Sequence, residues 1–366
     1  RWDAGALQPL VVAAMAERQL LLEQLQSLDA PLSLEALAAL LSRESIGTAA
    51  IEGQQLDPAD VRSSVARRLQ LPLERSSARS SAQVEGLVQV LFTAVEHPQH
   101  PLTLETLHQW HRDLFAAGPD GWMAIQIGVL RGSLPMQVVS GPMGRERLHF
   151  QAPPRDGLEQ QLAAFLAWFN QPPQHLNGLL RAGLAHLWFV TLHPYDDGNG
   201  RLARAVTDRA LAQLPWPSDN QADASLLSRA LGLSARFQQQ RQAYYNALES
   251  SQRGDLEVTA WLIWFVEQVQ ASAARHREVV AAVQAKALFW WRHRHSGFNQ
   301  RQQKLLNRLL DAEPDGFEGG MTLRKAISLT GVSRATAWRD LSDLVAIGAL
   351  VPLGDGRSRA YRLGLS

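Results

Sequence analysis

Twelve residues near the middle of the chain, from His193 to Arg204, combine the side chains that phosphate chemistry uses. They read His-Pro-Tyr-Asp-Asp-Gly-Asn-Gly-Arg-Leu-Ala-Arg. The glycines permit a tight turn whose backbone N–H groups can approach a ligand closely. Such a turn at a helix N-terminus is a ready anion site. Arg201 and Arg204 lie three residues apart, so both point toward one side of that helix and can grip phosphate oxygens.

Two further side chains extend this hypothesis. The carboxylate of Asp197 would be repelled by phosphate unless a cation lies between them, and Mg²⁺ held by one carboxylate plus substrate phosphates is the usual solution. His193 at the edge of the site can accept a proton from an attacking hydroxyl at neutral pH. Taken singly, each piece is more often structural, because a histidine before a proline commonly only ends a helix.

The whole string resembles the signature of Fic-domain proteins, His-Pro-Phe-x-(Asp/Glu)-Gly-Asn-Gly-Arg-x-x-Arg, with Tyr195 in place of the usual Phe. The resemblance implies that His193 is the general base on a target hydroxyl and that Asp197 holds Mg²⁺. It also implies that Arg201 and Arg204 bind the phosphates of ATP, whose α-phosphorus the hydroxyl attacks. The phosphate nest is then formed by Gly198, Asn199 and Gly200.

Two other stretches resemble parts of the same family. Residues 136–154 read as a β-hairpin and resemble the flap that binds a target peptide by strand addition; its first strand holds Gln137, Val138, Val139 and Ser140. The second stretch resembles the lining of the adenine pocket and contains Tyr244, Tyr245 and Gln252, where relatives often carry Asn in place of Gln252. Without the family, the first is an ordinary hairpin and the paired tyrosines are core residues.

A third stretch, Thr48-Ala-Ala-Ile-Glu52-Gly53, resembles the inhibitory-helix motif (Ser/Thr)-x-x-x-Glu-(Gly/Asn) of the family. The resemblance implies that Glu52 forms an ion pair with Arg204, which then cannot bind the γ-phosphate. Gly53 suits the position after a helix end. In some relatives the same glutamate positions a water that removes AMP, so Glu52 could make the enzyme bifunctional. Such hexapeptides also arise often by chance.

Helical periodicity dominates the rest of the chain. A first helix is expected over Leu10–Leu28, after Pro9, and a second with Ser33 as its N-cap and apolar residues through Leu41, followed by a separate short segment from Ser45 to Gly53. Another long helix is expected over Ala222–Glu249. His186 lies two helical turns before His193, and a metal pair is conceivable, although a packed or orienting histidine is the more common role.

The C-terminal segment from Lys286 to Ser366 has 13 Lys and Arg against 7 Asp and Glu, within a chain of net charge +1. Its order of helix, Gly-containing turn, helix and hairpin predicts a winged helix-turn-helix, resembling modules at the C-terminus of some bacterial Fic proteins. Ser333 would cap the second of these helices, expected over Ser333–Ile347, and Arg357 and Arg359 would lie on the wing. Residues 320–366 could bind DNA, but winged helices also serve in dimerisation or protein docking, so a homodimer stays open.

We therefore expect a mainly α protein with a Fic-like helical core, a small β-hairpin flap, an N-terminal helical region and a C-terminal winged helix-turn-helix. The expected domains are residues 1–81 with the inhibitory motif, 82–280 as the catalytic core and 286–366 as the winged helix. The N-terminal helices, including Trp2-Asp3, resemble a module often found before Fic cores. The Fic-like resemblance itself covers about Ser45 to Ala271.

The expected activity is that of a protein adenylyltransferase, which transfers AMP from ATP with Mg²⁺ to a Ser, Thr or Tyr hydroxyl of a protein. The alternative is a DNA-binding transcription regulator whose nucleotide site only senses ATP. The chain has no cysteine, which excludes disulfides and thiol nucleophiles. It has no apolar run of the ~18 residues that cross a membrane and no recognisable secretory signal, so the expected location is the cytoplasm, with no membrane partner.

Overall fold

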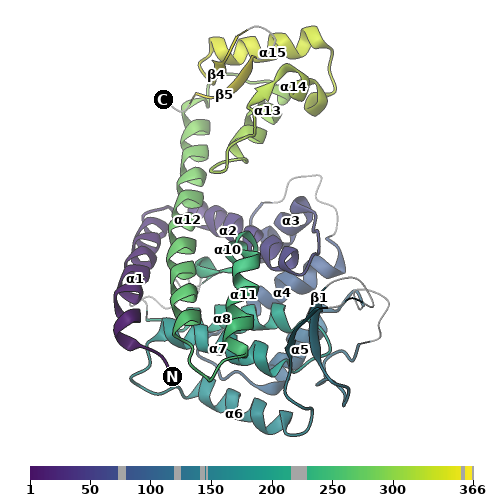
Figure 1. Ribbon diagram of the computed structural model, residues 1–366. Helices are drawn as coiled ribbons and strands as arrows, with labels where there is room; N and C mark the ends of the chain where they lie inside the picture. The colour runs from purple at the N-terminus through teal and green to yellow at the C-terminus, as the bar shows by residue number, and fades with distance from the viewer. Residues whose placement is uncertain are drawn as a thin grey trace. The chain divides into compact units, whose positions relative to one another are not determined.

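A computed structural model gives the fold of the protein (Figure 1). It describes residues 1–72, 80–118, 125–140, 145, 147–215, 229–355 and 359–364. Two compact units are present: one is formed by residues 1–27 and 33–276, and the other by residues 28–32 and 277–366. The division into three domains at 81 and 286 stays a prediction about domain boundaries.

The first unit is helical apart from one hairpin. Its helices are α1 (Ala4–Gln26), α2 (Ala30–Ile51), α3 (Pro58–Arg68), α4 (Ala82–Glu96), α5 (Leu104–Leu114), α6 (Leu158–Asn170), α7 (Gly178–Leu192), α8 (Asn199–Ala212), the 3₁₀ helix η1 (Arg229–Leu231), α10 (Ser234–Gln239), α11 (Arg241–Gln252) and the first part of α12 (Thr259–Arg292). In Figure 1, α7 and α8 pass through the middle of this unit, with α1 along one side and the hairpin along another.

The core of the first unit surrounds α7 and α8. Helix α7 is almost wholly apolar, as expected of a helix buried on all sides. Its Gly183 lies under α12, where a Cβ would come within 2.9 Å of the Phe265 ring. The Gly183 carbonyl also accepts a hydrogen bond of 2.8 Å from the Trp261 indole. This close contact with α12 fixes α7, the helix that ends immediately before the central motif.

The hairpin predicted from the sequence is present. Strand β1 (Gln137–Ser140) pairs antiparallel with β2 (Arg147–Gln151), and the register shifts between Val138 and Val139. The extra twist at such a bulge bends the strand locally. The glycine-containing turn expected over residues 141–144 lies outside the described residues.

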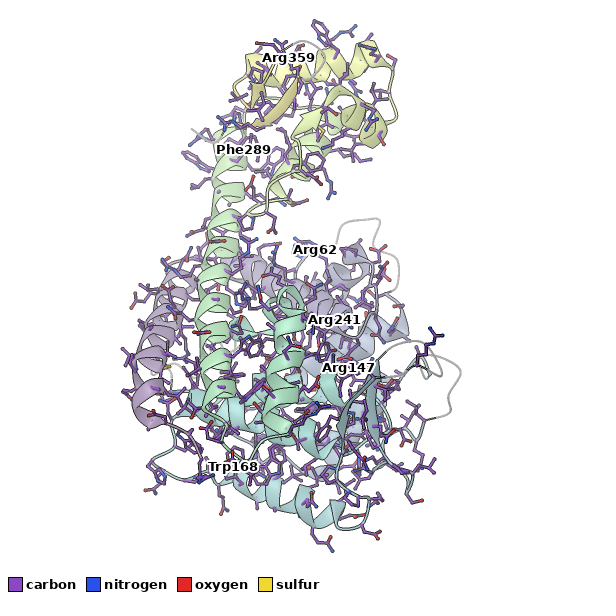
Figure 2. All side chains as sticks on the ribbon, in the orientation of Figure 1. Arg62, Arg147, Trp168, Arg241, Phe289 and Arg359 are labelled. Carbon is purple, nitrogen blue, oxygen red and sulfur yellow. The ribbon has the colours of Figure 1, made fainter. Side chains whose placement is uncertain are left out.

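The second unit has its own small core. The last part of α12 is followed by α13 (Gln300–Leu310), β3 (Met321–Thr322), α14 (Leu323–Thr330), α15 (Arg334–Ala346), β4 (Leu350–Leu353) and β5 (Ala360–Leu363). The strands form an antiparallel sheet in the order β3-β5-β4. Phe289, labelled in Figure 2, belongs to this core. Gly331 takes a left-handed conformation between α14 and α15, and Ser333 caps α15. Arg357, expected on the wing, lies outside the described residues.

The start of the first helix differs from the prediction. Helix α1 begins at Ala4 rather than after Pro9, which lies inside it. The Asp3 carboxylate accepts the Ala6 N–H at 3.1 Å and so caps the helix. The Asp3 N–H is itself bound to the Thr259 hydroxyl at 2.7 Å. This tertiary contact fixes the cap, and the helix continues despite the donor that Pro9 lacks.

The second helix is also longer than predicted. Helix α2 continues without a break past Ser45, where a separate short segment was predicted. Ser33 is not its N-cap; the Asp29 carboxylate instead accepts the Leu32 N–H at 2.9 Å. The Ser45 hydroxyl donates to the Leu41 carbonyl at 2.8 Å, so this short polar side chain is satisfied within the helix. One continuous helix thus carries the whole inhibitory-type motif up to Ile51.

The prediction of one helix over 222–249 was wrong for the residues of that range that the structure describes. Residues 229–252 form η1, α10 and α11, with a break at Gly232. A Cβ at Gly232 would lie 2.3 Å from Cγ of Glu44, so the chain approaches α2 too closely there for any other residue. Residues 222–228 lie outside the described part of the chain. In the described residues, no helix combines the length and apolar character needed to cross a membrane.

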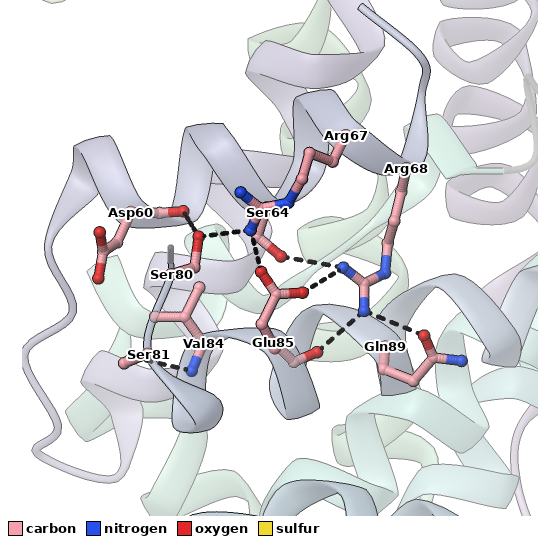
Figure 3. A network of polar contacts seen from close by, with 9 residues as sticks. All are labelled: Asp60, Ser64, Arg67, Arg68, Ser80, Ser81, Val84, Glu85 and Gln89. Carbon is pink, nitrogen blue, oxygen red and sulfur yellow. Dashed lines mark hydrogen bonds and ion pairs between the residues drawn. The ribbon is translucent and has the colours of Figure 1, made fainter. Parts of the chain in front are cut away.

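A polar network joins α3 to α4 (Figure 3). Arg67 and Arg68 both donate to the Glu85 carboxylate, Arg68 over 2.7 Å. Arg68 also donates to the Glu85 carbonyl at 3.2 Å and to the Gln89 side chain at 3.0 Å. Burial works against the charge of Glu85, but the two guanidinium groups hold its pKa below the usual value. The network fastens the two helices that flank residues 73–79.

Replacing Glu85 with Ala should therefore lower the free energy of unfolding by about 1–2 kcal/mol, because two arginines lose their shared acceptor. The matched control is Glu105→Ala, which removes an ion pair to Arg112 from a side chain that is 73% exposed. That change should cost about 0.5 kcal/mol or less. Urea denaturation compares the two, and equal losses would contradict the role given to the network.

Candidate functional site

The central motif forms the joint between α7 and α8. His193 ends α7 in a left-handed conformation (φ 49°, ψ 59°), and Pro194 prevents the helix from continuing, as predicted. Gly198 (φ 77°) starts α8. Between them, the Asn199 side chain accepts the Tyr195 N–H at 2.9 Å and donates to the Tyr195 carbonyl at 2.8 Å. These two bonds, here called the amide bracket, are made by a buried side chain and close the turn.

The imidazole of His193 is oriented by its own helix. Nδ1 lies 3.0 Å from the Val190 carbonyl, so Nδ1 carries the proton and Nε2 carries the lone pair. Burial lowers the pKa of His193, and the positive charge of Arg131 acts in the same direction. The Val190 carbonyl, Glu52 and Asp197 oppose this without reversing it. At neutral pH the side chain is therefore a neutral base.

Arg131 holds the unusual backbone of His193 in place. Its Nε donates to the His193 carbonyl at 2.8 Å, and its backbone N–H donates to the Pro194 carbonyl at 2.9 Å. Its Nη2 donates to the Pro153 carbonyl at 2.7 Å, just after β2. A left-handed conformation costs a residue with a side chain about 1–3 kcal/mol and persists where surrounding contacts enforce it. Arg131 supplies such contacts and joins the hairpin to the histidine.

Tyr195, the departure from the Fic signature, has a partner for its hydroxyl. The ring is fully buried, and its hydroxyl lies 3.0 Å from Nδ1 of His108. The imidazole of His111 stacks on it at 4.3 Å between centroids. Nδ1 of His111 accepts the Gly128 N–H, so Nε2 donates to the Asp197 carbonyl at 3.2 Å. Burial lowers the pKa of His111 to about 4, which keeps this tautomer uncharged.

The start of α8 presents donors to an anion. The Leu202 N–H makes the first intrahelical bond, to Gly198, so the N–H groups of the three preceding residues have no acceptor within the helix. Asp197 lies beside them with 49% of its side chain exposed, 3.6 Å from Arg201. The guanidinium of Arg201 is buried above the Phe115 ring at 4.9 Å.

Arg204 is engaged by α2. It is 2% exposed, and its Nη2 donates to the Glu52 carboxylate at 2.7 Å. Its Nε donates to the Thr48 hydroxyl at 2.7 Å, and Nη2 also to the Thr48 carbonyl at 3.1 Å. Nη1 of Arg204 is buried without a partner among the described residues. Burial favours the neutral forms of both Arg204 and Glu52, but their mutual attraction outweighs it, raising the first pKa and lowering the second.

Glu52 reaches Arg204 because of how α2 ends. The Gly53 N–H bonds to the Ala50 carbonyl and the Gln54 N–H to the Ala49 carbonyl, both at 3.0 Å, while Gly53 takes φ 80°. This is a Schellman end with Glu52 as the last residue before the glycine, as the sequence indicated. The absence of a Cβ at Gly200 completes the fit, since a Cβ there would lie 2.5 Å from the Glu52 carboxylate.

The residues expected at an adenine pocket differ in how deeply they are buried. Tyr244 is buried, with its hydroxyl 2.8 Å from Nε2 of His186, whose Nδ1 bonds to the Thr207 hydroxyl. His186 is thus a satisfied core residue. Tyr245 is partly exposed, and its hydroxyl reaches the Ile51 carbonyl at 3.4 Å. Gln252 bonds to the Thr191 hydroxyl at 3.2 Å and lines a largely apolar cavity of about 420 Å³.

The hairpin is fastened to α11 by charged groups. Glu249 accepts from Arg147, labelled in Figure 2, at 3.2 Å and lies 2.8 Å from Nδ1 of His149. Arg253 donates to the His149 carbonyl at 3.0 Å. These contacts hold β2, whereas the candidate flap residues Gln137, Val138, Val139 and Ser140 all lie on β1.

The described residues contain no group of three or more His, Asp or Glu side chains that could hold a metal ion. A cation at Asp197 would take its other ligands from phosphates and water, as Mg²⁺ commonly does. The half-exposed carboxylate next to the donors of α8 fits that arrangement.

Several residues of the site were missed from the sequence alone. Arg131, His108 and His111 reach the motif from 60 to 90 residues away, and their spacing gives no signal. Thr48 stands in the motif of α2, but its contact with Arg204 was not anticipated. The only available hint was Tyr195, whose added hydroxyl required a polar partner.

Together, a neutral histidine, a helix N-terminus and two buried arginines form a site on a helical protein whose chemistry suits holding phosphate and accepting a proton beside it. Residues 101–211 match the Fic/DOC family, so the chain carries a Fic domain. Residues 1–71 match a domain of unknown function, DUF4172. Residues 319–364 match the transcriptional regulator DIP2311-like, C-terminal domain.

Relatives share part of this chain. It is 32% identical over 109 residues to the protein adenylyltransferase Fic of Nematostella vectensis, covering 30% of this chain and 22% of that protein. It is 28% identical over 125 residues to a uridine 5'-monophosphate transferase of Xanthomonas campestris pv. campestris (strain 8004), covering 32% and 22%. The chain thus spans about a fifth of the length of these relatives.

A Fic family protein from Desulfovibrio desulfuricans G20 has a similar fold. Its crystal structure aligns with 97% of this chain and 96% of its own, at 18% identity and a TM-score of 0.53. The mainly α architecture with a small antiparallel hairpin is therefore the Fic fold, as expected from the sequence.

The amide bracket of Asn199 leads to a test of the turn. Asn199→Ala leaves the N–H and carbonyl of Tyr195 buried without partners, which should cost about 2–4 kcal/mol of stability. Tyr195→Phe is the matched control, because it removes only the hydroxyl bond to His108 and should cost about 1 kcal/mol or less. Denaturant titration measures both, and a smaller loss for Asn199→Ala than for Tyr195→Phe would refute the bracket.

Proposed function

We propose that the protein is a protein adenylyltransferase that transfers AMP from ATP to a Ser, Thr or Tyr hydroxyl of a protein target, itself included. The observation that carries the proposal is the lone pair on Nε2 of His193, held beside the N-terminus of α8 and its two arginines. The name of the Nematostella vectensis relative supports the reaction class.

The reaction follows from this arrangement. The target hydroxyl gives its proton to Nε2 of His193 while its oxygen forms a bond to the α-phosphorus of ATP. The bond from the α-phosphorus to the oxygen bridging to the β-phosphate breaks, and pyrophosphate leaves with the electron pair. The N–H groups of Asn199 and Gly200, together with Arg201, stabilise the negative charge on the phosphates. The Gly198 N–H would join them after leaving the Asp197 carboxylate, to which it donates over 2.5 Å. The Asn199 side chain acts differently, since it holds the turn closed.

Magnesium is the metal proposed for this site. Asp197 would hold it together with the phosphates of the nucleotide, since the described residues offer no larger ligand group. When bound, the ion neutralises phosphate charge and helps to orient the nucleotide.

The contact of Glu52 with Arg204, here called the brake, is proposed to be inhibitory. While Arg204 is bound by Glu52 it cannot receive the γ-phosphate, and the carboxylate repels that phosphate. ATP then binds in a pose that does not suit transfer. Glu52 is also proposed to position a water for a separate hydrolysis, in which the water oxygen bonds to the phosphorus of the attached AMP and the bond to the target oxygen breaks, giving AMP and the restored hydroxyl.

The residues expected at the adenine pocket and on the hairpin are proposed to have the roles that the family resemblance implies. Tyr245 and Gln252 would contact the base, whereas Tyr244 would support them from the core. The target peptide would add to β1 as a further strand and would pair with Gln137, Val138, Val139 and Ser140.

The C-terminal unit is proposed to be a winged helix, supported by its order of helices and strands and by the matched regulator domain. DNA or a second copy of the chain are the partners that it could take through residues 320–366. The lack of cysteine fits a reducing compartment such as the cytoplasm.

The labelling experiment tests the transfer reaction and the brake together. We expect Glu52→Gly to incorporate label from α-labelled ATP and Mg²⁺ at least about tenfold more than the unchanged protein, a shift of about 1.4 kcal/mol or more. Adding His193→Ala to this variant should lower incorporation by about 10²–10⁴-fold, the usual contribution of a general base. Autoradiography of the protein alone and with a cell lysate measures both effects.

The controls separate the alternatives. Chelation of Mg²⁺ should abolish label, and α-labelled UTP tests whether the donor is that of the Xanthomonas relative. No label with any nucleotide, together with DNA binding that persists in His193→Ala, would replace the proposal with a transcription regulator that senses ATP.

The pH dependence of Glu52→Gly follows from the neutral histidine. Only the neutral imidazole accepts a proton, so the rate should fall as pH decreases through the pKa of His193. Burial and Arg131 already lower that pKa, and removing the opposing charge of Glu52 lowers it further. The acid limb of kcat/KM should therefore lie below pH about 6.5, the ordinary value for histidine. A limb at or above that pH would show that another group is the base.

A further inference from the structure

Glu44 on α2, eight residues before Glu52, is buried against the chain that leads to α11. Glu44 is 2% exposed. Its carboxylate accepts the Ser234 N–H at 2.6 Å and the Ala235 N–H at 3.3 Å. These are the first two residues of α10, so a side chain of α2 caps another helix across a sequence distance of 190 residues.

Two glycines allow this approach. A Cβ at Gly232 would lie within 2.3–2.5 Å of three atoms of the Glu44 side chain. A Cβ at Gly47, one turn further along α2, would lie 2.6 Å from the backbone N and Cα of Ala235. The backbone of α2 at Gly47 therefore meets the backbone of α10, and the backbone at Gly232 meets the Glu44 side chain, so neither position accommodates a larger residue without displacement.

The surroundings of Glu44 suit a single negative charge. The N–H groups at the start of α10 carry partial positive charge, and Nε2 of His276 lies 3.7 Å from the carboxylate. Asp208 on α8 is also close, but burial and the proximity of Glu44 raise its pKa well above the usual value. This shift favours the neutral form of Asp208 beside Glu44.

This contact links the helix that leads to the brake with the helices that lead to Tyr245, one of the residues proposed to contact the base of the nucleotide. Helix α10 continues through Gln240 into α11, whose Tyr245 hydroxyl reaches back to the Ile51 carbonyl at the end of α2. Helix α2 is consequently fastened to α10 at Glu44, to α11 at Ile51 and to α8 through Thr48 and Glu52.

We propose that Glu44 is a positioning residue of the brake: by capping α10 it fixes α2, so that Glu52 stays on Arg204. This inference rests on the proposed function for the meaning of the brake, but not for the contact itself. Glu52 competes with a nucleotide phosphate for Arg204, and a competitor held in place has a high effective concentration. Loss of the Glu44 cap shifts the population toward the state in which Glu52 has left Arg204, without altering any group that contacts ATP.

The test is whether loss of the cap acts through Glu52. Glu44→Gln keeps the shape but turns an amide NH₂ toward the α10 N–H groups. In the otherwise unchanged protein it should raise AMP incorporation about tenfold, equivalent to about 1.4 kcal/mol. In the Glu52→Gly protein, where the brake is already absent, it should change incorporation less than about twofold, because the two effects pass through one contact.

A second variant protects the test against misfolding. Gly47→Ala pushes α2 away from α10 without changing any charge, and it should show the same dependence on Glu52. Glu35→Gln is the matched control on α2; Glu35 lies in an exposed ion pair with Arg62 (2.9 Å), which Figure 2 labels, and the change should leave incorporation unchanged. Incorporation that is unchanged or lowered by Glu44→Gln and Gly47→Ala, or raised equally with and without Glu52, overturns the proposal.

Hydrogen exchange gives a readout that does not need transfer. The amides of Glu52, Gly53 and Gln54 bond to the last turn of α2 and should exchange faster in Glu44→Gln than in Glu35→Gln. If Glu52→Gly takes no label while this exchange is faster, the proposed function fails and the anchoring role stands. If exchange at these amides is unchanged, the anchoring role fails whatever the labelling shows.

Discussion

The burial of Arg204 is the constraint on which the rest of the site depends. A guanidinium that is 2% exposed must have its donors satisfied, because an unpaired buried charge is costly. For Nε and Nη2, helix α2 and the residue after it meet this need with the carbonyl and hydroxyl of Thr48 and the carboxylate of Glu52, while Nη1 has no acceptor among the described residues. Any ligand that takes this arginine must replace those acceptors, so the stability of the resting state and the control of the site are the same interaction.

The geometry of the site depends on arginines that bind backbone rather than carboxylates. Arg131 donates to the carbonyl groups of His193 and Pro153. Arg209 on α8 donates to the carbonyls of Ala94 and His97 at the end of α4. Carbonyl groups at helix ends have no intrahelical donor, and a planar guanidinium can serve two of them at once. Arg131 thereby fixes the backbone of the turn, and Arg209 fixes α8 to the end of α4.

Two neutral histidines have separate structural roles near this turn. His111 supports the Asp197 carbonyl beneath the stacked ring of Tyr195, and His186 fills the core between Thr207 and Tyr244. Both have lowered pKa values because of burial. His193 differs from them because, among the described residues, only its Nδ1 has a partner, the Val190 carbonyl of its own helix. The distinction between a base and a packed histidine thus lies in what the second nitrogen meets.

Much of the fold could be predicted from the sequence, because helical periodicity and turn residues act over a few neighbouring positions. The hairpin, the end of α7 before Pro194 and the Ser333 cap are of this kind. The continuous α2 and the break at Gly232 were not predicted, since each depends on a partner: one on hydrogen bonds that satisfy Ser45, the other on the side chain of Glu44.

The sequence by itself determined the motif from His193 to Arg204, since twelve adjacent residues on a helix, a turn and a helix keep their relation wherever the chain folds. Through a family resemblance it also indicated Glu52 as a partner for Arg204. Only the tertiary structure decided that Arg131 holds the histidine, that Tyr195 meets His108 and that Glu44 caps α10. These contacts join residues 60 to 190 positions apart. Local propensity does not encode such distances, which are set when apolar faces pack and buried polar groups must find partners.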